Sequence, residues 1–298
     1  MKGIILAGGK GTRLYPLTLS TCKQLLPVYD KPLIYYPLSI LLMAGIREIL
    51  IISTEEDLPR FSAFFKDGKE LGISLSYCVQ KKPEGIAHAL ILAETFIQEE
   101  SVALILGDNI FYGDRLIDLL QKSQSLEEGA LVFGYEVKDP CRYGVFQFDE
   151  RKNVIDILEK PQVPPSSYAV TGLYFYDASA VEIAKQLKPS ARGELEISDV
   201  NRAYLQKGKL RVHLLERGCA WLDTGTPEAL AQAALYVQTL QERQGIKIGC
   251  PEEIAYQKQF ISKEQLEVLG RRWGNNEYGL YLQKIAQEPY FLDAHCRA

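Results

Sequence analysis

The first third of the chain repeats one unit, in which a short apolar run is followed by a loop and then by a helical stretch. The apolar runs are 2–7, 49–52, 73–79 and 102–106, and the stretches predicted as helices are 33–44, 58–65 and 86–96. Strands that are apolar on both faces and alternate with helices form mostly parallel sheets covered on both sides. We therefore predict an α/β fold, with ligands bound at the carboxyl ends of its strands.

The rest of the chain adds strands first and helices later. Four β candidates follow one another at 130–137, 144–148, 154–158 and 169–176, and we expect them to extend or flank the first sheet. After a helical stretch near 199–206 and a strand near 210–215, we predict a turn at 221–227 and a long helix to about residue 243, with Thr226 as its cap and Pro227 in its first turn. The prediction is a Rossmann-like, mostly parallel mixed sheet flanked by helices in a main domain of residues 1–244, with a small helical C-terminal lobe at 245–298.

Composition limits the possible partners and the compartment. The formal net charge of −4 gives no general positive field for nucleic acid. The longest apolar stretch, 33–44, is too short to span a bilayer, and the N-terminus lacks the features of a secretory signal. The cysteines form no C-x-x-C pair, which favours reduced thiols: Cys22, Cys78, Cys141, Cys219, Cys250 and Cys296. We predict a cytoplasmic protein that binds neither nucleic acid nor a membrane.

A glycine-rich segment, Gly8–Leu14, follows the first predicted strand. Glycines there allow backbone N–H groups to approach a phosphate chain, and Arg13 could hold phosphate oxygens with two parallel donors. The segment is neither a Walker A loop, because Lys10 is followed by Gly11, nor a G-x-G-x-x-G loop, because Leu14 stands at the third glycine position. A tight turn without a ligand remains the alternative interpretation.

Two carboxylates stand where predicted strands end. Asp108 follows the apolar run 102–106, and Asp223 follows Trp221 and Leu222. At the carboxyl edge of a sheet, two such acids could together bind Mg²⁺ between phosphate groups. From the residues alone, a turn cap is the alternative interpretation of each, because an isolated Asp after a strand is more often a turn residue than a ligand.

Several polar positions are less specific. Glu159 and Lys160 stand beside a proline that stops a strand, and a solvated ion pair is the plain alternative to a binding role. Lys23 could add a second phosphate-binding charge. Gln80 and Gly85 bracket a loop whose amide could read the edge of a base. The histidines are too far apart for a metal site, and no G-x-S-x-G elbow is present.

Taken together, these segments resemble the sugar-nucleotide pyrophosphorylases, a nucleotidyltransferase family that includes glucose-1-phosphate thymidylyltransferase. The segments that match in order and spacing are 6–14, 23–27, 107–109, 143–144, 159–161 and 221–225. The resemblance covers nearly the whole chain, because 196–202 and 274–279 also look like the short bacterial thymidylyltransferases. It implies the nucleotide-diphospho-sugar transferase fold.

The resemblance also implies roles for individual residues. Nucleotide binding falls to Gly8, Gly11, Thr12, Arg13, Lys23, Gln24, Gln80, Gly85 and Asp108. Sugar-phosphate binding falls to Asn109, Tyr143, Gly144, Glu159, Lys160, Val170 and Tyr174. Catalysis would rest on Arg13, Lys23, Lys160, Asp108 and Asp223, of which the two aspartates would bind Mg²⁺. Two departures from the family pattern, His88 for a usual Gln and Pro227 for a common His, leave these positions unchanged.

The implied reaction is an in-line attack of glucose 1-phosphate on the α-phosphorus of dTTP, which gives dTDP-glucose and pyrophosphate. It is the first step of dTDP-L-rhamnose and other deoxysugar synthesis for polysaccharides, and the family implies a homotetramer with feedback inhibition by dTDP-rhamnose. A sister enzyme that uses UTP or ATP and a silent nucleotide-sugar sensor stay open as alternatives. A nicotinamide dehydrogenase is disfavoured by Leu14 and by the absence of an acid at the tip of 49–52.

Overall fold

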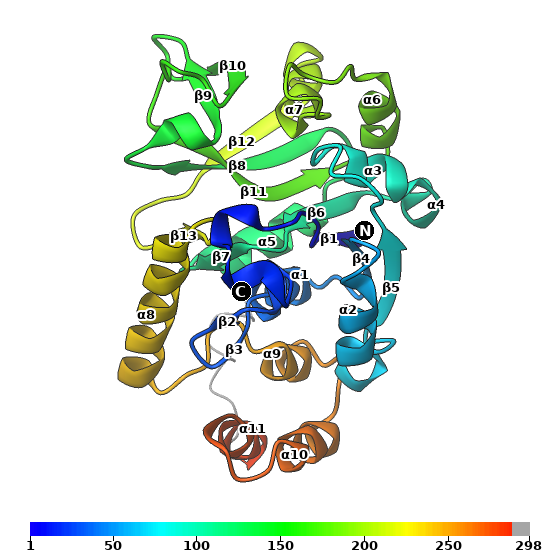
Figure 1. The fold of residues 1–298 in the computed structure, drawn as a ribbon, viewed down its shortest axis with the longest axis vertical. Helices are drawn as coiled ribbons and strands as arrows, with labels where there is room; N and C mark the ends of the chain where they lie inside the picture. Colours follow the sequence, from blue (N-terminus) through cyan, green and yellow to red (C-terminus); the bar gives the residue numbers. More distant parts are fainter. Residues whose placement is uncertain (288–298) are drawn as a thin grey trace.

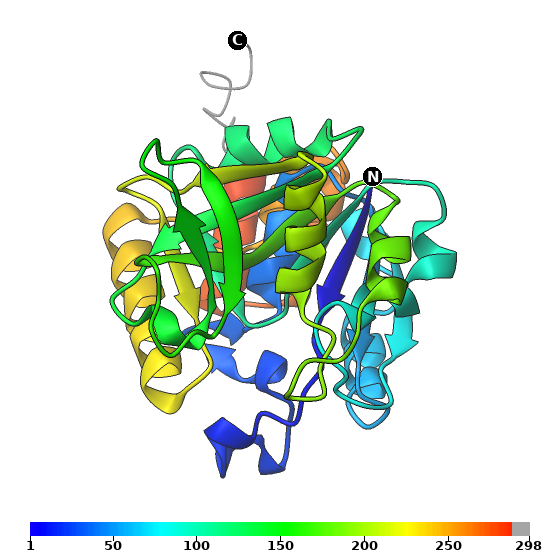
Figure 2. The same ribbon diagram turned by 90° about the horizontal axis from the view of Figure 1, so that it is seen from above.

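A nine-stranded mixed sheet runs through the molecule, and helices cover both of its faces (Figures 1 and 2). The structure is a computed structural model that describes residues 1–287, so the end of the predicted C-terminal lobe, with His295 and Cys296, lies outside the described residues. The strands of the sheet are β1 (Lys2–Leu6), β4 (Glu48–Ser53), β5 (Ser74–Val79), β6 (Val102–Leu106), β8 (Ala130–Glu136), β9 (Gly144–Phe148), β10 (Val154–Glu159), β11 (Tyr168–Tyr176) and β12 (Leu210–Leu214). The predicted α/β class is confirmed.

The parallel core of the sheet has the order β5-β4-β1-β6. In it Leu6, the last residue of β1, pairs with Leu106, the last residue of β6. The loops that follow these two strands therefore start side by side at one edge. This edge is the carboxyl end at which ligands bind in open α/β sheets.

The predicted middle strands extend this core, as expected. β11 pairs antiparallel with β6, β8 and β9, β10 pairs with β9, and β12 lies parallel to β8. The register between β11 and β8 shifts between Val170 and Tyr174. Glu159, the last residue of β10, lies opposite Gly144 at the start of β9, so a predicted sugar-side acid and a predicted sugar-side glycine are neighbours.

Alternate side chains of the strands build two separate cores. Ile5 packs with α1 (Tyr35–Met43), α2 (Leu58–Phe65) and α5 (Leu116–Gln124) on one face of the sheet. Ile4 packs with the helices of the other face, which are α3 (His88–Leu92), α4 (Glu94–Ile97), α6 (Ala180–Gln186) and α7 (Ile197–Gln206). Because neighbouring strand residues point to opposite faces, an apolar run without polar interruption is what such a two-sided sheet needs.

Some local expectations were wrong. The helix predicted at 86–96 begins only at His88 and breaks at Ala93, whose φ of −88° and ψ of 4° leave the helical region. Residues predicted as the start of a turn form β13 (Ala220–Asp223), which pairs with β7 (Asn109–Tyr112). The sequence did not predict α5 or α6. Short elements complete this part of the chain: β2 (Pro27–Val28), β3 (Lys31–Pro32), and 3₁₀ helices at Thr12–Leu14, Leu17–Leu19, Lys23–Leu25, Lys69–Leu71 and Pro140–Arg142.

The later helices follow the prediction more closely. α8 (Pro227–Gln244) starts at Pro227, and the Thr226 hydroxyl caps it by accepting a hydrogen bond from the backbone N–H of Ala229 at 3.2 Å. Three short helices follow, α9 (Pro251–Gln257), α10 (Lys263–Arg272) and α11 (Glu277–Gln287), and α9 lies against α1. No helix in the described part of the chain is both long enough and apolar enough to cross a bilayer.

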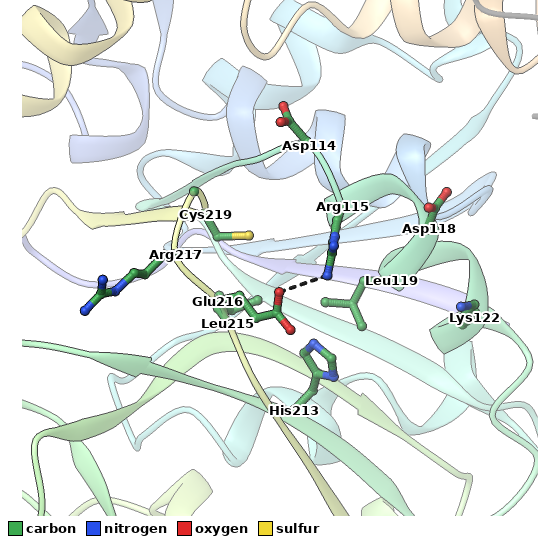
Figure 3. Close-up of a pocket in the computed structure, with 11 residues that line it drawn as sticks. Asp114, Arg115, Asp118, Leu119, Lys122, His213, Leu215, Glu216, Arg217 and Cys219 are labelled. Carbon is green, nitrogen blue, oxygen red and sulfur yellow. Dashed lines mark hydrogen bonds and ion pairs between the residues drawn. The ribbon is translucent and has the colours of Figure 1, made fainter. Parts of the chain in front are cut away.

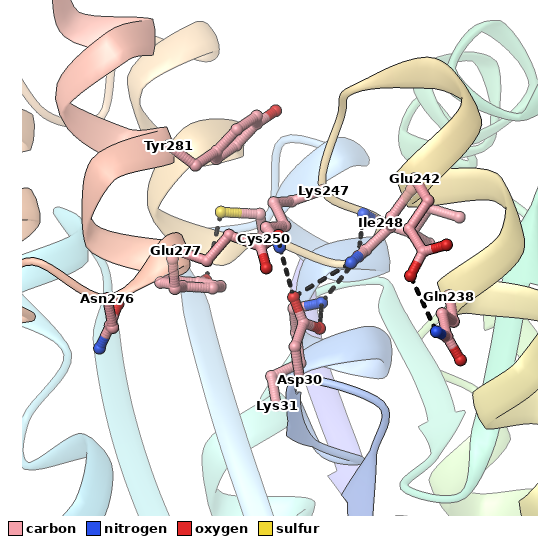
Figure 4. A network of polar contacts seen from close by, with 12 residues as sticks. Asp30, Lys31, Gln238, Glu242, Lys247, Ile248, Cys250, Asn276, Glu277 and Tyr281 are labelled. Atoms are coloured by element: carbon pink, nitrogen blue, oxygen red, sulfur yellow. Dashed lines mark hydrogen bonds and ion pairs between the residues drawn. The ribbon is translucent and has the colours of Figure 1, made fainter.

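A polar network ties the C-terminal helices to the N-terminal part of the chain (Figure 4). Lys247, in the segment between α8 and α9, donates to Asp30 at 2.8 Å and to Glu277 of α11 at 2.7 Å. Asp30 also accepts from the ammonium of Lys31 and, at 3.0 Å, from the amide of Gln241. The helices are therefore attached through the turn between β2 and β3, and the domain boundary at residue 244 stays a prediction.

Candidate active site

Two cavities adjoin at the carboxyl edge of the parallel core. One has a volume of about 420 Å³ and the other of about 250 Å³. Both are lined by Ile86 and Leu106 and by the charged side chains of Arg13 and Asp108. Because they share this wall, molecules bound in the two cavities would meet beside Arg13 and Asp108.

The larger cavity collects most residues predicted to bind the nucleotide. It is lined by Gly8, Gly11, Thr12, Arg13, Lys23, Gln24 and Asp108. Gly11 has φ of +60°, a left-handed conformation that favours glycine, and it leads directly into the 3₁₀ turn that carries Arg13. The loop after β1 thus contributes Gly8, Gly11 and Thr12 to the lining of the cavity.

Gln80 and Gly85 lie outside the lining of this cavity. Gln80 lines a neighbouring cavity of about 440 Å³ with Gly9 and Lys10. Gly85 has φ of +102°, and a Cβ there would stand 2.3 Å from the backbone oxygen of Leu195, so its backbone packs against the segment before α7. The structure therefore places Gln80 at the margin of the site and gives Gly85 a packing reason to be glycine.

The smaller cavity collects every residue predicted to bind the sugar phosphate. Its lining includes Asn109, Tyr143, Gly144, Glu159, Lys160, Val170 and Tyr174. Asp223, the second predicted metal ligand, also lines it. Residues from β7, β9, β10, β11 and β13 thus converge on one space.

The pairing of β7 with β13 brings the two predicted metal ligands together. Asp223 lies opposite Asn109, the residue after Asp108, in this antiparallel pair. The hydroxyl of Thr224 donates to the backbone oxygen of Asp108 at 3.0 Å and fixes the two strand ends relative to each other. Segments more than 100 residues apart therefore bring Asp223, which lines the smaller cavity, close to Asp108 in the wall shared by the cavities.

The two carboxylates are in different electrostatic states. Burial acts to raise the pKa of Asp108, but the ammonium of Lys23 and the hydrogen bond from the Asn109 amide at 2.8 Å outweigh it and hold that pKa below its usual range. Burial and the negative charge of Asp108 raise the pKa of Asp223. Among the described residues, no group of three or more His, Cys, Asp or Glu side chains could hold a metal. A cation here would use these two acids and oxygen atoms from elsewhere.

The structure adds residues that the sequence analysis gave no role. Arg142 lies 3.4 Å from the carboxylate of Asp223, to which the Tyr143 hydroxyl donates at 3.3 Å. Burial, and next the charge of Asp223, raise the pKa of Tyr143 to about 12, so its hydroxyl stays protonated. The indole N–H of Trp221 donates to Asn109 Oδ1 at 2.6 Å. Trp221 stood in a matching segment, whereas nothing in the local sequence singled out Arg142.

Glu159 is also held by residues from a distant segment. The hydroxyl of Ser198 donates to its Oε2 at 2.5 Å, and Arg192 lies 3.4 Å from its Oε1. Lys160, with φ of +43°, donates its backbone N–H to the oxygen of Tyr143 at 2.9 Å, and its ammonium lies 3.8 Å from Glu159. Glu159 and Lys160 therefore both line the smaller cavity, and the Lys160 side chain is still 44% exposed to solvent.

A further cavity of about 610 Å³ contains none of the predicted site residues (Figure 3). It lies between the start of α5 and the segment that follows β12, where Arg115 pairs with Glu216 at 3.0 Å. Arg217 and Lys122 also line it. Its lining contains both acidic and basic side chains, and it shares no lining residue with the two adjoining cavities.

A family model described as nucleotidyl transferase matches residues 2–239, which carry both adjoining cavities. The chain belongs to the nucleotidyl transferase family. The name agrees with the family that the sequence motifs resemble, and it makes the chain an enzyme that transfers a nucleotidyl group.

More specific names than that of the family come from individual relatives of this nucleotidyl transferase. A glucose-1-phosphate thymidylyltransferase of Neisseria meningitidis serogroup A is 56% identical, over 97% of this chain and 100% of the relative. One from Xanthomonas campestris pv. campestris is 54% identical, over 96% and 97%. A Bacillus anthracis protein assigned as a glucose-1-phosphate thymidylyltransferase and crystallised with sucrose has a TM-score of 0.73 at 45% identity, covering 79% of this chain and 94% of that one. A UDP-glucose pyrophosphorylase with UDP-glucose has a TM-score of 0.69 at 26% identity, covering 80% and 98%.

Proposed function

We propose that this nucleotidyl transferase is a glucose-1-phosphate thymidylyltransferase, which converts dTTP and α-D-glucose 1-phosphate to dTDP-glucose and pyrophosphate. The observation that carries the proposal is the wall that the two cavities share at Arg13 and Asp108. A nucleotide in one cavity and a sugar phosphate in the other would bring their phosphates together there. The names of the relatives support dTTP and glucose 1-phosphate as the pair.

On the nucleotide side, we assign the phosphates to the loop after β1 with Arg13 and Lys23, and the base to Gln24 and Gln80. Gln24 supports this assignment, because its side-chain oxygen is buried without a hydrogen-bond partner in the structure. Buried acceptors are rarely left unpaired, and an N–H group of the base would supply the donor. Gly85 would set the position of the loop that follows Gln80.

On the sugar side, we assign the phosphate of the substrate to Lys160 and its hydroxyl groups to Asn109, Glu159 and Tyr143. Asn109 and Glu159 each hold hydrogen bonds from distant segments, so their side chains are oriented before a sugar arrives. Gly144, Val170 and Tyr174 complete the wall. Such an arrangement suits a rigid, hydroxyl-rich ligand.

We assign Mg²⁺ to Asp108 and Asp223. The residues fit a hard cation, because Lys23 pairs with Asp108 alone, Arg142 reaches Asp223 only at 3.4 Å, and the charge of Asp108 raises the pKa of Asp223. When bound, the ion would neutralise charge between the phosphates of the two substrates. With no third acidic ligand among the described residues, phosphate oxygens and water would complete its shell.

The chemistry then needs no protein nucleophile and no general base. The attacking oxygen of the sugar phosphate is already an anion, and it displaces pyrophosphate from the α-phosphorus in line. Arg13, Lys23 and Lys160 bring two polyanions together and offset the charge that builds on the leaving group. Turnover should therefore depend on these cations much more than stability does.

The direct test is a nucleotide panel. Purified protein is mixed with Mg²⁺, glucose 1-phosphate and each of dTTP, UTP, ATP, CTP and GTP, and pyrophosphate release is followed while the sugar nucleotide is identified. We expect rapid metal-dependent release with dTTP and slower release with UTP, because one methyl group is worth only ~1 kcal/mol. Preference for another nucleotide would reassign the base pocket, and no release with any nucleotide would favour a silent sensor.

We also infer a cytoplasmic homotetramer whose activity is inhibited by dTDP-rhamnose. The free thiols of the described cysteines, Cys22, Cys78, Cys141, Cys219 and Cys250, suit the cytoplasm. The cavity in Figure 3 supports a second nucleotide site, because Arg115, Arg217 and Lys122 line it and could receive a diphosphate. Light scattering that gives a monomer, or full activity at saturating dTDP-rhamnose, would remove this inference.

A further inference from the structure

The side-chain amide of Gln80 lies against the glycine loop of the nucleotide site. Gln80 is only 6% exposed, and its backbone N–H donates at 2.7 Å to the oxygen of Ser53, the last residue of β4. Its side-chain oxygen lies 2.7 Å from the place that a Cβ on Gly8 would occupy. The oxygen, and not the nitrogen, therefore faces the loop that we assign to the nucleotide.

A short relay of hydrogen bonds accounts for that orientation. His88 is the first residue of α3, and its Nε2 lies 3.3 Å from the carboxylate of Glu84. A carboxylate accepts, so in the neutral imidazole the tautomer that fits this contact carries its proton on Nε2 and leaves the other ring nitrogen as an acceptor. That nitrogen, Nδ1, lies 3.4 Å from the amide nitrogen of Gln80, which can only donate.

We propose that His88 is a positioning residue that turns the oxygen of the Gln80 amide toward the nucleotide base. The inference deepens the proposed function and rests on it. An acceptor at this point suits thymine and uracil, which carry a hydrogen on N3, and opposes cytosine, which presents a lone pair there. Without His88 the amide can turn by half a rotation and offer its two donors instead. His88 thus separates N3–H bases from cytosine and does not separate dTTP from UTP.

The test compares two substitutions of His88 with the parent enzyme. In His88→Leu the volume is nearly kept and the acceptor is lost, whereas His88→Asn keeps a polar atom near the position of Nδ1. We expect His88→Leu to raise the KM for dTTP and for UTP ~10-fold and to lower the dTTP-to-dCTP ratio of kcat/KM ~10-fold, because the amide loses its fixed orientation. The KM for glucose 1-phosphate and the kcat with dTTP should stay unchanged.

His88→Asn serves as the matched rescue. We expect its KM for dTTP within ~3-fold of the parent, because its side-chain oxygen can accept the same hydrogen bond. A purely structural histidine predicts the reverse order, since a partly buried apolar leucine should then be the milder change. Parent-like KM values and selectivity in His88→Leu, or equal losses in both variants together with lower melting temperatures, would overturn the proposal.

Calorimetric binding of dTTP and of dCTP to the same three proteins keeps this inference separate from the proposed function. If the parent makes no dTDP-glucose, the proposed function fails, and the binding data still test His88. Weaker dTTP binding by His88→Leu, with dCTP binding unchanged or stronger, is the expected result. Equal dTTP affinity in the parent and in His88→Leu would contradict the positioning role.

Discussion

Two clusters of aspartate and lysine in this chain are built from the same residue types and differ in how completely their charges are paired. In the Asp30 cluster, one carboxylate accepts from Lys31, Lys247 and the amide of Gln241. Both lysines are nearly out of contact with solvent, with side chains 2% and 4% exposed. Burial acts to raise the pKa of Asp30, yet these partners together hold it below the usual value.

The Asp108 cluster holds two carboxylates, and only one of them has a close lysine partner. Lys23 pairs with Asp108, while Asp223 has only the longer contacts to Arg142 and Tyr143, at 3.4 and 3.3 Å. Burial and the charge of Asp108 raise the pKa of Asp223, the opposite direction to Asp30. A closed cluster stabilises the fold, whereas a cluster with an incompletely paired charge beside a cavity is suited to a ligand.

The largest expected effect is a loss of turnover when Asp223 or Arg13 is replaced. We expect Asp223→Asn and Arg13→Ala each to lower kcat by at least ~100-fold, because both remove charge from groups that we assign to the metal and to the reacting phosphates. The melting temperature should stay nearly unchanged, since neither side chain completes a closed network. Steady-state kinetics and thermal unfolding measure the two quantities, and near-normal turnover in both variants would end the assignment.

The next effect is on stability alone. Asp30→Asn leaves Lys31 and Lys247 buried without their shared counter-ion, and we expect it to lower the free energy of unfolding by about 2 kcal/mol. The kcat with dTTP should not change. Glu242→Gln is the matched control, because Glu242 takes part in an exposed hydrogen bond with Gln238 beside the network (Figure 4) and should cost less than ~0.5 kcal/mol. Urea unfolding of the three proteins that shows equal stability would remove the structural role of the Asp30 cluster.

A smaller effect concerns the smaller cavity, which we assign to the sugar phosphate. Trp221→Phe removes the indole donor to Asn109 Oδ1 and leaves the backbone N–H of Gly172, at 3.1 Å, as its partner. We expect the KM for glucose 1-phosphate to rise ~5-fold through the lost hydrogen bond, with the KM for dTTP unchanged. Initial rates with each substrate varied in turn give both constants. A change confined to the KM for dTTP would contradict the assignment of Trp221 to the sugar side of the site.

The smallest expected effect is a pH dependence of the free energy of unfolding that has opposite signs for Asp30 and Asp223. Asp30 has a lowered pKa in the folded state, so its contribution to stability is present above 3.8 and is lost as the pH falls through the folded value. Asp223 has a raised pKa, so its contribution is present at acid pH and is lost as the pH rises through the folded value. Relative to the parent, Asp223→Asn should therefore gain stability as the pH rises, while Asp30→Asn should lose it. Urea unfolding at several pH values measures the free energy of unfolding of both variants. If this free energy changed with pH in the same direction for both variants relative to the parent, the comparison of the two clusters would be refuted.

The parallel core could be predicted because its signals are local. The apolar runs 2–7 and 102–106 mark buried strands, and the loops after them hold Arg13 and Asp108. In contrast, no local pattern pairs β7 with β13, because the two segments are more than 100 residues apart and their register depends on the assembled fold. From its local sequence, Asp223 is therefore explained by a turn more readily than by a ligand role.

The candidate site, like the fold, could be predicted only in part. The resemblance supplied most of the residues that meet in the two cavities, although Gln80 and Gly85 lie outside them, whereas the residues alone favoured a surface pair at Glu159 and Lys160. The sequence could not indicate that Ser198 and Arg192 hold Glu159, since these contacts join a strand end to a helix start and to a loop. The helix α5 carried a usable signal, two buried leucines four residues apart at 116 and 120, which the sequence analysis did not use.

The most direct test of the account follows the α-phosphate itself. The protein is incubated with [α-³²P]dTTP, glucose 1-phosphate and Mg²⁺, and the labelled products are separated, with Asp30→Asn and Asp223→Asn run alongside. The account predicts that the label moves into dTDP-glucose in the parent and in Asp30→Asn at similar rates, and at least ~100-fold more slowly in Asp223→Asn. Label that stays in dTTP with the parent, or equal transfer by all three proteins, would contradict it.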